Sequence, residues 1–284
     1  MAREEIASVP DDDLVCPEVG GWTEDKHRLV SLYAKLFSSG MKLKWDKRIY
    51  LELYAGAGYS KIRGTSRIIL GSPLRALMLK DPFDKYLFCE EDPEKLDALK
   101  IRAKRTAPTA DIAYVEGDCN ERVSAILAKI PAGSRGNTVL TLCFVDPCDI
   151  GIKFKTLHAL SSRYVDFLVL LALYMDANRA YAHYISRKST KVADFLGSTS
   201  WRDRWAIAQS EGVLFPRYLA QEFASRMETL GYIPPPFYKM KEVVLPEKNY
   251  PLYRLALFSR NPRAYEFWDD VLKYSTDQTD FGWG

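Results

Sequence analysis

The sequence has 284 residues, of which 47% are hydrophobic and 13% aromatic, and its formal net charge at pH 7 is +3. A chain of this length and composition can bury a sizeable core, which excludes an intrinsically disordered protein. It has no apolar run near the roughly 20 residues that span a bilayer and no opening signal peptide. We therefore expect a cytoplasmic protein without a membrane partner.

The charges are unevenly distributed along the first 80 residues. Residues 1–20 contain one Arg and six acidic residues, whereas residues 21–80 contain twelve Lys or Arg and four acidic residues. We expect residues 1–20 to form a flexible acidic extension and residues 21–284 to form one domain. The basic stretch indicates either a surface that attracts nucleic acid or another anionic partner, or a solvated helix face beside an acidic tail.

Helices and strands alternate through the first half of the chain. Thr23, followed by two acids, is the expected N-cap of the first helix, and Ser72, followed by a proline, is the expected N-cap of the second. In chain order, the pattern predicts a helix over 22–37, a strand over 48–55, a polar-to-apolar connection over 59–71, a helix over 72–80, a strand over 85–90, a helix over 93–104 and a strand over 112–115.

The alternation continues and then gives way to a helical stretch. The elements expected here are helices over 125–130 and 154–162, strands over 138–145 and 165–171, a helical insertion over about 176–231, a last strand over 252–258 and a helix over 262–274. The continuous apolar run over 138–145 is the expected central strand. This order predicts an α/β fold with a doubly wound, mostly parallel, Rossmann-like sheet and a helical insertion before the last strands.

The most informative motif is ELYAGAG at residues 52–58, which follows the first predicted strand. Glycines allow the backbone to approach a ligand closely, and ligands of such sheets bind at the carboxyl ends of the strands. Three later predicted strands also end in an acid at this edge. The four acids are Glu52, Glu90, Asp118 and Asp146.

These four acids suit S-adenosylmethionine as a cofactor. Glu52 is expected to hold its ammonium group, Glu90 both ribose hydroxyls and Asp118 the adenine amino group. Asp146 faces the place where the methyl group is transferred. The expected cofactor-binding residues are Glu52, Tyr54, Ala55, Gly56, Gly58, Glu90, Glu91, Asp118 and Asp146. No metal is expected, because the cysteines form no Cys-x-x-Cys pair and the histidines are far apart.

Two departures disfavour a dinucleotide at the glycine turn. The dinucleotide fingerprint needs Gly or Ala three positions after the second glycine, where this chain has Lys61. The acid for the ribose should follow about 20 residues on, but Glu90 lies 32 residues beyond Gly58. A P-loop is excluded as well, because no Gly-Lys-Ser/Thr follows the glycines.

Methyl transfer from a sulfonium requires little covalent machinery, because the methyl group is already activated and the protein mainly aligns the reactants. Amino-group methyltransferases that act on nucleic acids often carry Asp-Pro-Pro-aromatic at the fourth strand. This chain has Asp146-Pro147-Cys148-Asp149, so the second proline and the stacking ring are missing. Asp146 and Pro147 are the expected catalytic residues.

From about Trp22 to Tyr274, the sequence resembles the three-Cys-motif partner protein (TcmP) family. The motifs that carry the resemblance are Gly21-Trp22-Thr23 with Lys26-His27 and Tyr33, YLELYAGAG, Gly71-Ser72-Pro73-Leu74, Phe88-Cys89-Glu90-Glu91-Asp92, Phe144-Val145-Asp146-Pro147, Asn178-Arg179, Phe195-Leu196-Gly197 with Trp201, and Leu252-Tyr253-Arg254-Leu255 with Phe258-Ser259. The resemblance implies a prokaryotic methyltransferase-like protein with a radical-SAM-like three-Cys partner. The family tends to have Phe-Gly where this chain has Cys148-Asp149, which alters the turn at the reactive end.

Three functions remain open from the sequence. The first is an S-adenosylmethionine-dependent methyltransferase acting on nucleic acid or on a polypeptide delivered by the partner, with Lys26, His27 and Arg179 as expected substrate contacts. The second is a catalytically silent scaffold subunit, and the third is a nucleic-acid-binding module without chemistry. Basic residues beside aromatic ones in the helical insertion indicate either phosphate contacts with base stacking or aromatic core residues covered by Arg stems.

Overall fold

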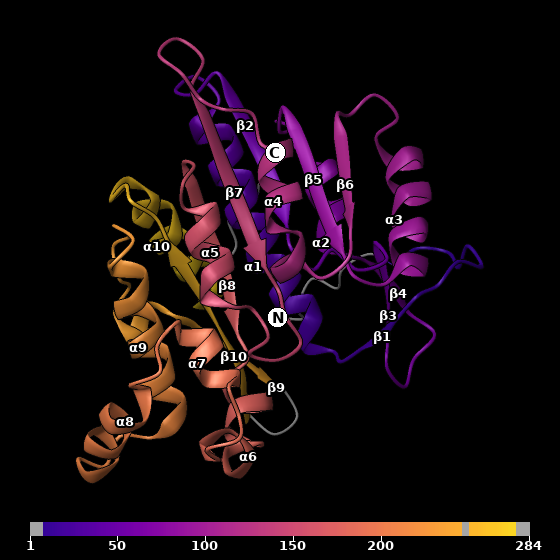
Figure 1. Cartoon of the computed structure of the whole chain (residues 1–284). Helices are drawn as coiled ribbons and strands as arrows, with labels where there is room; N and C mark the ends of the chain where they lie inside the picture. Colours follow the sequence, from indigo (N-terminus) through magenta and orange to yellow (C-terminus); the bar gives the residue numbers. More distant parts are fainter. Residues whose placement is uncertain (1–7, 246–249, 277–284) are drawn as a thin grey trace.

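The computed structural model describes residues 8–245 and 250–276, and a seven-stranded sheet lies at its centre (Figure 1). The strands lie in the order β6-β5-β2-β7-β8-β10-β9. Their bounds are β2 (Lys47–Glu52), β5 (Lys85–Glu90), β6 (Ile112–Glu116), β7 (Val139–Val145), β8 (Val165–Leu171), β9 (Lys241–Leu245) and β10 (Tyr250–Phe258). β10 is antiparallel to both of its neighbours, and the other neighbouring pairs are parallel. This arrangement confirms the predicted doubly wound, mostly parallel, Rossmann-like sheet.

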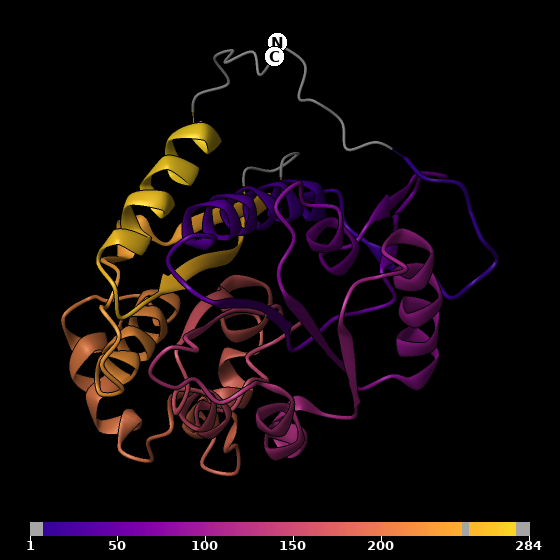
Figure 2. The same cartoon turned by 90° about the horizontal axis from the view of Figure 1, so that it is seen from above.

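Helices cover both faces of the sheet (Figure 2). One face carries α1 (Trp22–Met41), α2 (Ser72–Leu77), α3 (Pro93–Thr106) and α10 (Arg263–Thr276), and the other carries α4 (Cys119–Lys129) and α5 (Phe154–Leu160). The predicted helical insertion lies between β8 and β9 as η1 (Leu173–Asn178), α6 (Tyr181–Ile185), α7 (Lys191–Leu196), α8 (Trp201–Ser210), α9 (Phe215–Glu228) and η2 (Phe237–Lys239). Within the described residues, no helix is long and apolar enough to cross a membrane.

Two apolar cores lie on opposite faces of the sheet, and β7 contributes to both. Every residue of β7 is buried. Because successive side chains of a strand point to opposite faces, Leu142 and Phe144 enter the core under α1, whereas Cys143 and Val145 enter the core under α5. A strand that is covered on both faces has no solvated side, which explains the continuous apolar run seen in the sequence.

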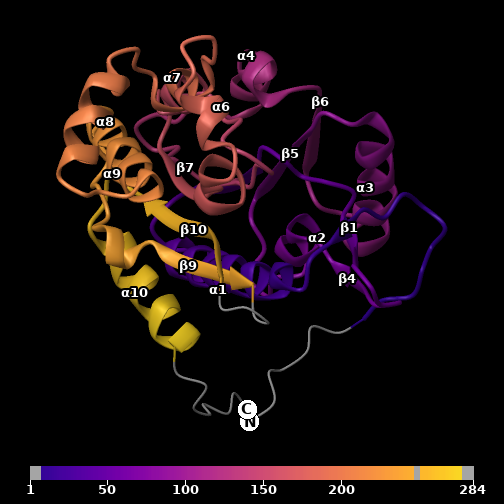
Figure 3. The ribbon, with the colours of Figure 1, turned by 90° about the horizontal axis from the view of Figure 1, so that it is seen from below.

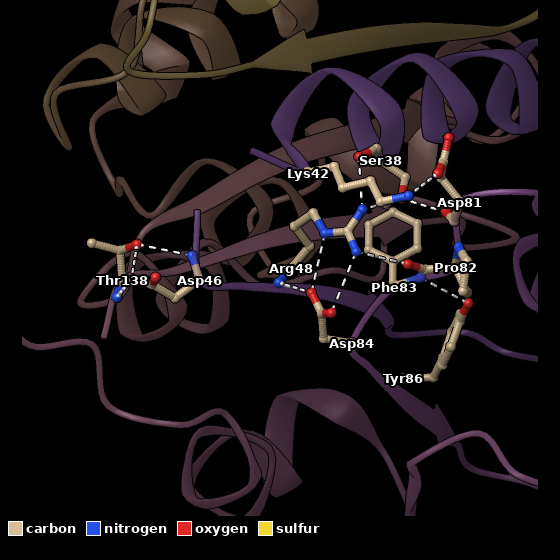
Figure 4. A network of polar contacts seen from close by, with 10 residues as sticks. All are labelled: Ser38, Lys42, Asp46, Arg48, Asp81, Pro82, Phe83, Asp84, Tyr86 and Thr138. Atoms are coloured by element: carbon tan, nitrogen blue, oxygen red, sulfur yellow. Dashed lines mark hydrogen bonds and ion pairs between the residues drawn. The ribbon is translucent and has the colours of Figure 1, made fainter. Parts of the chain in front are cut away.

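Arg48 fastens α1 to the amino-terminal edge of the sheet (Figure 4). The residue is only 5% exposed, and its guanidinium donates hydrogen bonds to the backbone oxygens of Ser38 on α1 at 2.8 Å and of Pro82 at 2.9 Å. Asp84 accepts from Nε of Arg48 at 3.1 Å, and an ion pair of 2.6 Å between Lys42 and Asp81 lies beside this network.

This anchor sets the position of α1 relative to the sheet. The last turns of α1 lie at the amino-terminal edge through Ser38, while Lys26 in its second turn pairs with Asp146 at the carboxyl edge. The helix therefore extends from the amino-terminal edge to the carboxyl edge of the sheet. Its first turns lie at the carboxyl ends of the parallel strands, where ligands of this fold bind.

A second, three-stranded sheet replaces the connection that the sequence predicts over 59–71. It consists of β1 (Glu18–Val19), β3 (Tyr59–Ile62) and β4 (Ile68–Leu70), in the order β1-β3-β4. The sheet lies beside α2 and α3, away from α10 (Figure 3). The sequence predicts only a polar-to-apolar connection here and misses these strands, because each has at most four residues, too few for a periodic signal.

Several element ends also differ from the sequence prediction. Gly21, not Thr23, is the N-cap of α1, and Gly71, not Ser72, is the N-cap of α2. Neither predicted residue caps its helix, because both are already inside the first turn. The strand β9 was missed; its sequence, KEVVL, gives too short an alternation to be separated from a loop.

Candidate cofactor-binding site

A cleft lies at the carboxyl edge of β2, β5 and β7, the edge to which the strand arrowheads point in Figure 1. Its cavity volume is about 190 Å³. The lining residues come from elements far apart in sequence and are Pro17, Val19, Thr23, Lys26, His27, Tyr54, Ala55, Gly56, Ala57, Gly58, Ser60, Gly71, Ser72, Glu90, Lys95 and Asp146. The cleft thus brings together most of the residues that the sequence predicts for a site.

The glycine turn begins where β2 ends. Gly56 and Gly58 have φ values of 65° and 81°, in the left-handed region that favours glycine. The backbone N–H of Ala55 donates to the carbonyl of Cys89 at 2.9 Å, and that of Gly56 donates to Oε2 of Glu90 at 2.7 Å. A Cβ placed on Gly56 meets no atom within 4 Å, so the cleft leaves open space directly over this backbone.

Glu90 ends β5 and stands in the cleft wall beside the glycine turn. Its carboxylate accepts hydrogen bonds from the backbone N–H of Gly56 at 2.7 Å and of Asp92 at 3.1 Å. A carboxylate offers about four acceptor sites, so this one keeps acceptor capacity for hydroxyl groups in the cleft. Its predicted role toward a ribose stays a prediction.

Glu52 lies beneath the cleft rather than in its wall. The residue is 0% exposed, and its carboxyl group accepts hydrogen bonds from the hydroxyls of Tyr50 and Ser72. Burial raises the pKa of Glu52 well above its ordinary value, while the hydrogen bond from Ser72 opposes this rise. Because Ser72 lines the cleft and Glu52 does not, a ligand in the cleft would meet the hydroxyl of Ser72 rather than the carboxyl group of Glu52.

Asp146 follows β7 directly and faces α1 across the cleft. Its Oδ2 atom lies 2.6 Å from Nζ of Lys26, and the two side chains are 15% and 12% exposed. The structure therefore brings together two residues that the sequence assigned separately to the reactive end and to substrate contact. Pro147, the other predicted catalytic residue, is buried and does not line the cleft.

His27 lines the cleft beside Lys26. It is 4% exposed, and its Nδ1 has no hydrogen-bond partner among the described residues. Burial and the positive charges of Lys26 and Arg75 lower the pKa of His27 well below its ordinary value. This direction favours the uncharged form of the imidazole.

Three further predicted site residues, in addition to Glu52 and Pro147, lie outside the cleft lining. Asp118 is the N-cap of α4 and accepts a hydrogen bond from the backbone N–H of Asn120 at 2.8 Å. Glu91 and Arg179 are exposed at the surface. Because helix capping alone explains an acid after β6, the position of Asp118 has a local cause that does not depend on a ligand.

The N-terminal segment, which we define as residues 8–20, contains no predicted site residue but contributes to the cleft. Pro17 and Val19 of this segment close one side of the cleft. The backbone N–H of Lys61 in β3 donates to the carbonyl of Pro17 at 3.0 Å. Nothing in the local sequence of this segment indicates that contact, since its partners follow more than 40 residues later.

Arg102 on α3 holds the N-terminal segment against the glycine turn. Its side chain is 1% exposed; the guanidinium pairs with Asp12 and donates to the backbone oxygen of Ala57 at 2.7 Å. The guanidinium also lies 4.1 Å from the centre of the Tyr59 ring. Residues 1–20 were expected to be a flexible extension. Residues 1–7 lie outside the described residues, and this ion pair packs residues 8–20 against the domain.

The basic and aromatic residues of the helical insertion contact one another. Trp201 is fully buried and Trp205 is 7% exposed. Arg202 stacks over the ring of Trp201 at 4.4 Å, and Arg204 pairs with Glu222 at 2.6 Å. These contacts favour the interpretation of an aromatic core covered by Arg side chains over that of a base-stacking surface.

All five cysteines are free in the structure. Within residues 8–245 and 250–276, no group of three or more His, Cys, Asp or Glu is placed to hold a metal ion. Lys95 and Ser60 are further polar residues of the cleft that the sequence analysis did not single out. Thr23 and Ser72, which also line the cleft, belong to the motifs Gly21-Trp22-Thr23 and Gly71-Ser72-Pro73-Leu74 that the sequence shows.

No family model and no curated protein sequence matches this chain. Among solved structures, Trm1 from Pyrococcus horikoshii in complex with S-adenosyl-L-methionine is 10% identical with a TM-score of 0.41, over 87% of this chain and 58% of that one. Cofactor-bound Rv0187 from MTB is 12% identical with a TM-score of 0.41, over 81% and 79% of the chains. Protein LPL1258 from Legionella pneumophila is 16% identical with a TM-score of 0.40, over 61% and 74%. At these values the likeness concerns the fold alone.

Proposed function

We propose that this chain binds S-adenosylmethionine in the cleft and transfers its methyl group. The observation that carries the proposal is one wall in which the open backbone of Gly56 lies beside the carboxylate of Glu90, while Asp146 stands at the opposite side. A backbone that a ligand can approach, next to a carboxylate at the neighbouring strand end, suits a ribose and its attached chain.

In this proposal, S-adenosylmethionine supplies an already activated methyl group, and the residues of the chain bind it and align it with an acceptor. Glu90 accepts the ribose hydroxyls with the acceptor sites that its backbone contacts leave free. Ser72, supported by Glu52, and the neutral His27 offer hydrogen bonds to the polar end of the cofactor. Asp146 and Lys26 border the place of transfer.

The cleft is narrow for such a ligand. Its volume of about 190 Å³ is below the roughly 300–1,000 Å³ of typical small-molecule pockets. Pro17 and Val19 account for part of this small volume, since they line one side of the cleft. We infer that the N-terminal segment moves outward when the cofactor binds.

The methyl acceptor belongs to the same proposal. The resemblance to the three-Cys-motif partner family favours a polypeptide delivered by a radical-SAM-like partner, and the basic stretch over 21–80 favours nucleic acid. The two differ in their salt dependence, because phosphate contacts release counterions and weaken steeply as salt increases. A methylation assay on total nucleic acid and on lysate protein, each at low and high salt, separates them.

Calorimetric titration of S-adenosylmethionine and of its demethylated product tests the cofactor. We expect both to bind, and we expect Glu90→Gln to weaken each by about ten-fold or more, because hydrogen bonds to a charged group contribute roughly 1.5–3 kcal/mol each. Glu91→Gln is the matched control, since Glu91 is the adjacent acid but lies outside the cleft. If neither ligand binds at millimolar concentration, the proposal fails.

A second candidate function is a silent subunit that keeps the fold without the chemistry. The ion pair of 2.6 Å favours it, because Lys26 neutralises the carboxylate of Asp146 at the place where an acceptor amine would approach. The missing second proline and aromatic ring after Asp146 agree with this candidate. Loss of a genuine methylation signal in Asp146→Ala, with cofactor binding retained, excludes it.

A further inference from the structure

A second cavity lies at the opposite, amino-terminal edge of the sheet. Its volume is about 310 Å³, and it is bounded by α1, the first residues of β7 and β8 and the start of α10. This places it within the size range of small-molecule sites. Its lining includes Tyr33, Phe37, Trp45, Tyr164, Asp166 and Phe267.

Five of the fifteen residues that line this cavity are aromatic. The rings of Tyr33 and Phe37 lie 6.3 Å apart, and those of Trp45 and Tyr164 lie 5.6 Å apart. Tyr164 is 64% exposed, so it stands at the mouth, whereas Tyr33 is fully buried in the interior. Such rings favour a planar aromatic occupant through stacked and edge-to-face contacts.

The hydroxyl group of Tyr33 is a buried donor without use in the protein. Among the described residues it has no hydrogen-bond partner. Its ring packs edge-on against Trp268 at 5.8 Å, a contact that Phe would make equally well. Because an unpaired buried hydroxyl destabilises the folded state, its presence on the wall of a cavity points to a polar group of a ligand.

Asp166 supplies the complementary group in the same wall. It is 8% exposed, and burial raises its pKa to about 7, while a hydrogen bond with Ser259 and the charge of Arg260 oppose the rise. The charge of Asp166 contributes, after burial, to the raised pKa of Tyr33, so the two groups lie within reach of each other's field. The wall thus contains both a hydroxyl donor and a carboxyl group.

The cations around this cavity do not form an anion site. Arg260 donates to the backbone oxygens of Ser161 at 2.8 Å and of Leu230 at 3.1 Å, so its guanidinium is held by the protein. Lys44 and Arg263 are exposed at the rim. A carboxylate ligand inside would also meet Asp166, which disfavours an acidic occupant.

We propose that this cavity binds a small, uncharged planar aromatic molecule that carries a hydrogen-bond acceptor beside an N–H donor, as in an aromatic primary amide. Tyr33 donates to the acceptor, Asp166 accepts from the N–H, and the ring lies between the aromatic side chains. The site is separate from the cofactor cleft and does not depend on the function proposed for that cleft.

Saturation-transfer NMR with benzamide tests the site. At about 20 mM probe, a concentration that reveals millimolar binding, we expect saturation transfer to benzamide, and a weakening of at least about five-fold in Tyr33→Phe. Tyr238→Phe is the matched control, because Tyr238 is 80% exposed and lies outside the cavity. Toluene, which keeps the ring but lacks the amide, should bind the wild type and Tyr33→Phe equally.

Two further measurements decide the location. Excess S-adenosylhomocysteine should leave benzamide bound, and a crystal of the wild type soaked with benzamide should show its amide within hydrogen-bond distance of Oη of Tyr33. No saturation transfer, equal binding by Tyr33→Phe, displacement by S-adenosylhomocysteine, or an amide seated elsewhere each overturns the proposal. The soaked crystal keeps this test valid even if the Tyr33 variant does not fold.

Discussion

Lys26 and Asp146, which are 120 residues apart in sequence, meet across the cleft at 2.6 Å. One lies near the start of α1 and the other directly after β7, so the pair joins the helix that spans one face to the central strand. Because both side chains are largely removed from solvent, their charges set the local field more strongly than a surface pair does.

This pair predicts how the cleft distinguishes S-adenosylmethionine, whose sulfur is positive, from its neutral product. In Lys26→Met the remaining carboxylate should raise the ratio of the two affinities in favour of the positive ligand by about three- to ten-fold, and Asp146→Asn should lower it by a similar factor. Calorimetric titration of both ligands measures the ratio. Lys100→Met, which breaks a pair on the surface of α3, is the control. An unchanged ratio in both cleft variants contradicts the assignment of Asp146 to the reactive end.

The two glycines of the turn should respond differently to alanine. A Cβ on Gly58 lies 3.0 Å from a methyl of Leu99 and 3.3 Å from Leu74, whereas a Cβ on Gly56 projects into open space. Both residues have positive φ, so Gly56→Ala should cost about 1 kcal/mol of unfolding free energy and Gly58→Ala about 2–4 kcal/mol. Urea unfolding measures the difference. Equal losses of unfolding free energy in the two variants would show that Leu74 and Leu99 can move away from the added methyl group at no cost.

Gly56→Ala also separates stability from cofactor binding. Its methyl group projects into the space that we assign to the cofactor, so the variant should stay folded yet bind S-adenosylmethionine at least about ten-fold more weakly. Calorimetry on the folded variant measures this loss. Retained affinity would move the ligand away from the glycine turn.

The pair of Arg102 with Asp12 should make the stability of the protein depend on acid pH. The hydrogen bond and charge of Arg102 lower the pKa of Asp12, although burial opposes this. The carboxylate therefore stabilises the fold above the ordinary Asp pKa of about 3.9, and this contribution is lost as the pH falls below it. Asp12→Asn should reduce the unfolding free energy by about 1–2 kcal/mol at pH 7 and by less at pH 3. Asp97→Asn, in an exposed pair, is the control, and a deficit that is constant with pH excludes the ionic mechanism.

The raised pKa of Asp166 predicts a pH dependence of stability opposite in sign to that of Asp12. Because burial raises its pKa to about 7, the folded protein binds a proton that the unfolded chain has already lost between about pH 4 and pH 7. Wild-type stability therefore falls over this range, and Asp166→Asn should gain about 2–4 kcal/mol relative to wild type between pH 4 and pH 8. Urea unfolding at both pH values, with the exposed Asp203→Asn as control, measures the change. A pH-independent difference would place Asp166 in a solvated site.

The sequence by itself determined the alternation of strands and helices and the fold class. The run over 138–145 and the strand over 165–171 matched β7 and β8 closely, because strands covered on both faces leave an unbroken apolar signal. The glycine turn was equally readable, since Gly56 and Gly58 hold backbone conformations that few other residues tolerate.

Only the tertiary structure decided which of these residues share a site. Acids follow strands both as ligand contacts and as helix caps, so no local pattern separates Glu90, in the cleft wall, from Asp118, at the start of α4. Arg102 binds Asp12, a residue 90 positions earlier in the chain. Lys26 binds Asp146, a residue 120 positions later. Helix and strand periodicity arises within a few residues, whereas these contacts depend on how whole elements pack, and no short stretch of sequence contains that information.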